Sequence, residues 1–114
     1  MSLRADREWL TLRDLVQVLG LSPGRIHRLV EEHHLLGTRA SGVFRVPADF
    51  IRDGEPLSEL RGTIVVLLDA GFTEEEALDW LLDPAEELDG TAPIDALRAG
   101  RKAEVRRVAQ SLAL

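Results

Sequence analysis

A short break, Gly20-Leu21-Ser22-Pro23, separates two amphipathic segments and restricts the fold more than any other feature of the sequence. Thr11 is a suitable N-cap, and the apolar residues after it share one helix face: Leu12, Leu15, Val16 and Leu19. Gly20 is typical of a helix C-terminus, and Ser22-Pro23 is typical of a helix start. The pattern predicts a helix of about eight residues, a tight turn and a second helix over 23–33, which together form a helix-turn-helix.

The residues that follow change from helical to alternating period. Val43-Phe44-Arg45-Val46 reads as a short strand, and Ala40-Ser41-Gly42 as the turn before it, so residues 35–46 predict a β-hairpin. A hairpin placed directly after the second helix is a wing. Pro47 then begins a segment predicted to form one helical turn, which places Phe50 or Ile51 in the core.

Turn-forming residues at 52–56 mark a boundary between two halves of the chain. Beyond it, apolar periodicity, the Thr73–Glu76 capping box and Gly100 predict four helices, at 57–70, 74–82, 94–99 and 101–112. The predicted fold is mainly α, with a winged helix-turn-helix and its short β-hairpin wing packed against a C-terminal helical bundle. The expected organisation is a flexible tail (1–8), the winged unit (9–54) and the helical domain (55–114).

Charge is distributed unevenly between these halves. The chain has a net charge of −6, yet residues 1–54 contain eight Arg and seven acidic residues, whereas residues 55–114 contain six basic and thirteen acidic residues. The N-terminal half is therefore able to approach a polyanion although the whole chain is acidic.

The predicted recognition helix and wing contain the candidate DNA-binding residues. The major groove admits one helix, whose N-terminal residues face the bases while the opposite stripe packs on its neighbour. Gly24 would let the backbone approach a phosphate, Ser22 and the helix N-terminus could hold a phosphate oxygen, and arginines could contact bases or backbone. The candidates are Ser22, Gly24, Arg25, His27 and Arg28 on the helix and Arg39 and Arg45 on the wing.

Other functions have less support in the sequence. A small winged fold can instead serve as a protein-interaction module with solvated arginines. No nucleophile, Gly-rich phosphate loop or His–Asp pairing accompanies the acidic residues at 74–76 and 86–87, so we expect neither an enzyme nor a cofactor. The chain lacks Cys, and His33 and His34 are expected to cap the helix, so no metal site is predicted. Trp9 is expected to be a hydrophobic staple and Trp80 a core residue.

The sequence from Trp9 to Ile51 resembles the winged helix-turn-helix of the MerR and excisionase superfamily, above all in FRVPADFI after the wing. Over residues 9–114 the chain is similar to an actinobacterial family that includes a mycobacterial DNA-binding substrate of the Ser/Thr kinase PknL. The shared segments are LSPGRIHRL, GVFRVP, GFTEEEALDWL, PIDALRAGR and VAQSLA. The C-terminal half is also similar to the toxin-binding domain of Xre/ParS/MbcA-type antitoxins.

This resemblance implies double-stranded DNA as the partner, contacted by Ser22 to Arg28 and by Arg39 and Arg45. It also implies a Ser/Thr kinase acting on a tail threonine, or a toxin-like protein, as a further partner. The sequence departs from the family here, because its first ten residues contain no Thr. No apolar run reaches the length of a membrane span and no leucine-zipper heptad is present, so we expect a cytoplasmic, nucleoid-associated monomer or weak dimer.

Overall fold

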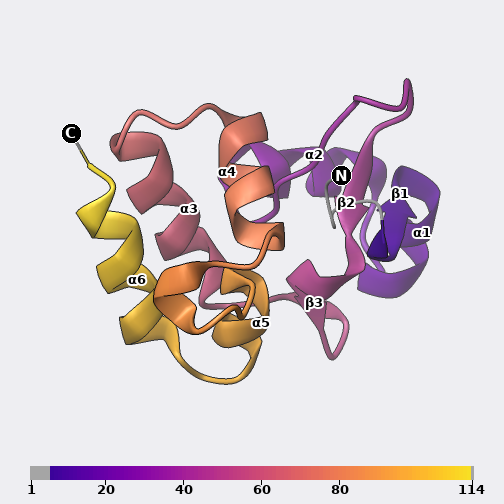
Figure 1. Ribbon diagram of the computed structural model, residues 1–114. Helices are drawn as coiled ribbons and strands as arrows, with labels where there is room; N and C mark the ends of the chain where they lie inside the picture. The colour runs from indigo at the N-terminus through magenta and orange to yellow at the C-terminus, as the bar shows by residue number, and fades with distance from the viewer. Residues whose placement is uncertain (1–5, 114) are drawn as a thin grey trace.

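The predicted helix-turn-helix is present in the computed structural model, which describes residues 6–113 (Figure 1). Helix α1 (Leu12–Leu19) begins with a capping box, in which the Asp14 amide donates to Thr11 Oγ1 at 3.2 Å and the Thr11 amide donates to Asp14 Oδ2 at 3.0 Å. Gly20 ends the helix in the left-handed region, at φ 65°. Both ends of α1 therefore follow from local side-chain chemistry.

Helix α2 (Pro23–Glu31) ends two residues earlier than predicted. Its start is as expected, with the Arg25 amide donating to Ser22 Oγ at 3.3 Å. At its end, the His34 amide donates to the Leu29 carbonyl at 2.8 Å and the His33 amide to the Val30 carbonyl at 3.1 Å. His33 therefore occupies, at φ 64°, the left-handed Schellman position that glycine usually takes. Because this position is not glycine, the sequence pattern did not predict that the helix ends here.

The wing is a loop closed at its base by backbone pairing, with less strand than predicted. Thr38 and Arg45 exchange two backbone hydrogen bonds of 2.9 Å and form an isolated bridge. Strand β2 (Arg45–Pro47) pairs instead with an unpredicted strand, β1 (Trp9–Thr11), in antiparallel register with Trp9 opposite Pro47. Trp9 is thus a strand residue, two positions before the Thr11 cap. We call residues 39–44 the wing.

A second small sheet lies where the sequence predicted the boundary between halves. The 3₁₀ turn η2 (Ala48–Phe50) buries Phe50 completely, and strands β3 (Ile51–Arg52) and β4 (Glu55–Pro56) follow it. Asp53 and Gly54 connect them with positive φ angles of 54° and 75°, the backbone of a two-residue type I′ hairpin.

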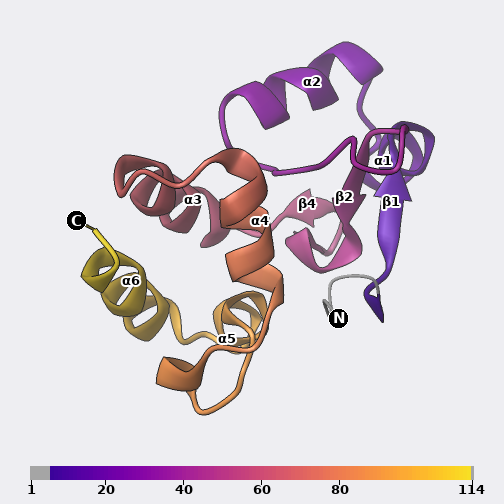
Figure 2. The same cartoon turned by 45° about the horizontal axis from the view of Figure 1, so that its top comes forward.

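The C-terminal half consists of helices, as predicted. They are α3 (Leu60–Asp69), α4 (Glu74–Leu82), the 3₁₀ turn η3 (Glu86–Leu88), α5 (Pro93–Arg98) and α6 (Lys102–Ser111). Helix α3 packs against α4 and α6, and α5 packs against α4, α6 and η2 (Figure 2). Helix α3 starts later than predicted, although Leu57 is buried ahead of it. Trp80 is half-buried and not fully in the core.

The two halves share one hydrophobic core. A single cluster of buried side chains includes Leu15 and Ile26 of the winged unit, Phe50 of the connection, and Leu78 and Val105 of the helical half. None of the helices in residues 6–113 is long and apolar enough to cross a membrane.

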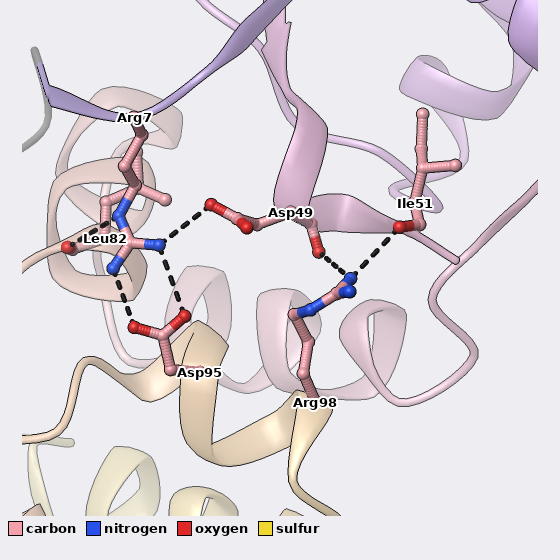
Figure 3. Close-up of polar contacts among 6 residues, drawn as sticks. All are labelled: Arg7, Asp49, Ile51, Leu82, Asp95 and Arg98. Carbon is pink, nitrogen blue, oxygen red and sulfur yellow. Dashed lines mark hydrogen bonds and ion pairs between the residues drawn. The ribbon is translucent and has the colours of Figure 1, made fainter. Parts of the chain in front are cut away.

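Two arginines add polar links between the halves (Figure 3). Arg7 forms ion pairs with Asp49 at 2.8 Å and Asp95 at 2.9 Å and donates to the Leu82 carbonyl at 3.3 Å. Arg98 donates to the carbonyls of Asp49 and Ile51 at 2.9 and 3.0 Å. Arg7 belongs to the segment expected to be a flexible tail, yet it is held by three elements; residues 1–5 of that segment lie outside the described residues.

Candidate nucleic-acid interface

The N-terminal half of α2 presents a basic, solvent-exposed surface. Ile26 is fully buried and fixes the rotation of the helix, so that Arg25, His27 and Arg28 are exposed on its other side. Within residues 6–113, neither Arg25 nor Arg28 forms an ion pair with a carboxylate. The acidic half of the chain therefore leaves both guanidinium groups available, which is the geometry a recognition helix needs.

The first turn of α2 is also open to close approach. Gly24 is exposed, and no heavy atom lies within 4 Å of the position that a Cβ would occupy there. The Ser22 hydroxyl accepts from the Arg25 amide and the Ser22 carbonyl accepts from the Ile26 amide, while Pro23 has no N–H. The Gly24 amide is therefore the donor that the first turn leaves without an intrahelical partner. This end of the helix can bind a phosphate oxygen by donating hydrogen bonds to it.

A hollow of about 640 Å³ lies between α1, α2 and the wing. Three basic side chains line it, Arg13 from α1, His27 from α2 and Arg39 from the wing, together with wing residues Val43 and Phe44. Figure 2 shows the wing loop beside α1, with α2 at the top of the molecule. The three elements thus bring three basic side chains to one hollow.

Arg13 was not among the predicted site residues. Its exposure could be foreseen, because it lies off the apolar stripe of α1. Its position facing the wing could not, because that depends on the pairing of β1 with β2, which brings the wing over the start of α1.

The two predicted wing arginines have different surroundings. Arg39 is exposed, with its guanidinium carbon 5.2 Å from the centre of the Phe44 ring. Arg45 is half-buried at the base of the wing, 5.1 Å from the centre of the Trp9 ring, and its Nε is buried without a hydrogen-bond partner. Arg39 is therefore placed as a contact residue, whereas Arg45 mainly packs against β1.

The end of α2 is connected to α4. His33 Nε2 lies 3.8 Å from Glu74 Oε1, and the Thr38 hydroxyl donates to Glu75. Arg61 of α3 also donates to the Glu32 carbonyl at 2.9 Å. These contacts orient α2 against the helical half. No cluster of three or more potential metal-ligating side chains occurs in residues 6–113.

The fold and this exposed basic helix define a winged helix-turn-helix protein with an added helical domain. Residues 2–51 match the family model of the winged helix-turn-helix domain of DNA-binding protein Rv2175c, and residues 57–113 match the Rv2175c C-terminal domain of unknown function. The chain belongs to the Rv2175c family.

Individual relatives agree in sequence and fold. The chain is 29% identical over 120 residues to DNA-binding protein Rv2175c of Mycobacterium tuberculosis, a match that covers 95% of this chain and 82% of the relative. The NMR structure of Rv2175c superposes with a TM-score of 0.84 and 29% identity, covering 96% of this chain and 83% of that one. The mainly helical winged architecture predicted from the sequence is thereby confirmed.

Proposed function

We propose that this chain binds double-stranded DNA and acts as a transcriptional regulator, with α2 in the major groove. The observation that carries the proposal is the exposed, unpaired state of Arg25 and Arg28 on the face of α2 opposite buried Ile26. Bidentate guanidinium contacts to guanine or phosphate are the commonest use of arginine in such a position. The name of the relative, a DNA-binding protein, supports the same function.

The wing contacts are also part of the proposal. Arg13 and Arg39 hold the DNA backbone beside α2, and His27 faces the hollow between them. Arg45 contributes indirectly, because its stacking on Trp9 fixes the base of the wing.

We infer that the protein is a monomer or a weak dimer and acts at the nucleoid. The longest helices in residues 6–113 have ten residues, which is too short for a dimerising coiled coil of three to four heptads.

Binding to double-stranded DNA across a salt series tests the proposal. Arg25→Ala and Arg28→Ala are each expected to weaken binding by about 1–3 kcal/mol for a base contact, or to lower the salt slope by about one for a phosphate contact. Arg107→Ala, an exposed arginine on α6, is the matched control and should bind like the wild type. The proposal fails if the folded protein forms no complex at about 50 mM salt, or if the Arg25/Arg28 double variant binds normally.

A further inference from the structure

A second hollow, of about 650 Å³, lies in the helical half and has no role in the proposed DNA contact. It is formed by Phe72, by α4, and by residues 83–87, which lead from α4 into η3, and we call it the Trp80 hollow. Phe72, Trp80 and Pro84 supply its apolar lining. In Figure 2, α2 lies at the top of the molecule, whereas α4 runs downward through its middle toward the orange segment that follows it.

The aromatic lining packs against the outside of the core and is not part of its buried interior. Helix α4 buries Ala77, Leu78, Leu81 and Leu82 completely on its inner side, which already supplies its packing face. Trp80 and Phe72 remain half-buried, with part of each ring at the surface of the hollow. A tryptophan that is partly exposed in a concave site is a typical anchor for a partner side chain.

The rim of this hollow is acidic. Glu76, Glu86 and Glu87 line it and are exposed, and Asp79 and Asp83, which have interactions of their own, add to the carboxylates. No Lys, Arg or His of the described residues lines the hollow. The local potential is therefore negative, in a half of the chain that is itself acidic.

We propose that the Trp80 hollow binds an arginine-rich segment of a partner protein. A guanidinium group can lie over the Trp80 or Phe72 ring while its N–H groups pair with Glu86 or Glu87. A nucleic acid would be repelled by the rim, and a neutral apolar segment would desolvate carboxylates without pairing them. The inference does not depend on DNA binding, because the two surfaces share no residue.

The two tryptophans allow a direct test on the full chain. The probe is a nine-residue peptide of Gly, Ser and three Arg, and its control has citrulline in place of each Arg. Nuclear magnetic resonance then follows the indole N–H signals, which Trp80→Phe assigns. We expect the arginine peptide to shift the Trp80 signal and leave the Trp9 signal in place, and the citrulline peptide to shift neither.

Charge-neutral variants test the rim. Glu86→Gln with Glu87→Gln is expected to weaken peptide binding about three- to tenfold, whereas Glu31→Gln with Glu32→Gln, exposed residues at the end of α2, should leave it unchanged. Equal binding of the citrulline peptide, equal shifts of both tryptophans or an unaffected Glu86/Glu87 variant would overturn the proposal. So would a Trp80 shift caused by double-stranded DNA or by protein concentration alone, since the first identifies DNA and the second a further copy of this chain as the occupant.

Discussion

Arg7 and Asp95 form a two-point ion pair although they are 88 positions apart in the chain. Arg7 Nη2 lies 2.9 Å from Asp95 Oδ2, and Nη1 lies 3.3 Å from Oδ1. The bond to Asp95 raises the pKa of the Arg7 guanidinium, with Asp49 contributing in the same direction. This side chain thus connects the residues just before β1 to η2, to the end of α4 and to the start of α5 (Figure 3).

Arg7→Ala is expected to lower the free energy of unfolding by about 1–2 kcal/mol, because charge-assisted hydrogen bonds to three elements are lost together. The loss is modest because both carboxylates are partly exposed and are rehydrated when Arg7 is removed. Urea denaturation measures the effect. Arg107→Ala should stay within about 0.5 kcal/mol of the wild type, and an equally small change for Arg7→Ala would show that the network has little energetic weight.

Gly24→Ala separates stability from DNA binding. The site is helical, has an ordinary φ and offers open space for a methyl group, so the protein should become more stable by about 0.5–1 kcal/mol. DNA affinity should fall, because the added methyl group stands where the helix N-terminus approaches a phosphate. Thermal unfolding and a binding titration on the same preparation check both effects. An unchanged DNA affinity would show that no phosphate is bound at the N-terminus of α2.

Gly37→Ala should disturb the wing. A Cβ there would lie 2.6 Å from the Phe44 ring and 2.7 Å from the Arg45 carbonyl oxygen, and the latter is backbone that cannot easily move. We expect a loss of about 1–3 kcal/mol in stability, with changed amide signals across residues 38–45. Ala40→Ser, an exposed change in the same loop, is the control. A wild-type spectrum for Gly37→Ala would contradict the packing described for the wing.

The capping box of α1 should make stability depend on pH. The Thr11 amide bonded to Asp14, aided by the Thr11 hydroxyl, lowers the pKa of Asp14 from its ordinary 3.8. The unfolded chain then takes up this proton first as the pH falls, so the contribution of Asp14 is present above about pH 4 and is lost below it. Asp14→Asn should therefore be less stable than the wild type near neutral pH and approach it in acid.

Urea midpoints at about pH 7, 4 and 2.5 measure this difference. Asp69→Asn, at the exposed end of α3, controls for the loss of one negative charge. A gap between Asp14→Asn and the wild type that stays constant over this pH range would show that the capping box does not titrate.

Features set by neighbouring residues were predictable from the sequence. The caps at Thr11, Ser22 and Thr73 start α1, α2 and α4 as expected, because each cap bonds an amide three residues away. The burial of Ile26 likewise follows from helical spacing, and it places Arg25 and Arg28 on the exposed side.

Features that need distant partners were not predictable. The position of Trp9 near the first N-cap predicted a hydrophobic staple. In the structure, pairing of β1 with β2 makes Trp9 a strand residue and places its ring beside the Arg45 guanidinium. Arg13 joins the candidate interface for the same reason. The early end of α2 has a local cause, the left-handed backbone of His33. It was not predictable because glycine is the residue that usually marks this conformation in a sequence.

The shared core and the Asp49 contacts also bear on how this architecture can be divided. The segments 2–51 and 57–113 are separate units of sequence, yet the Asp49 carbonyl of the first accepts from Arg98 of the second, and Arg7 of the first is paired with Asp95 of the second. The same cluster of apolar side chains runs through both. A chimera that took each segment from a different relative would need complementary side chains where the two segments pack together. Because the segments share one core, the natural chain should unfold in a single transition.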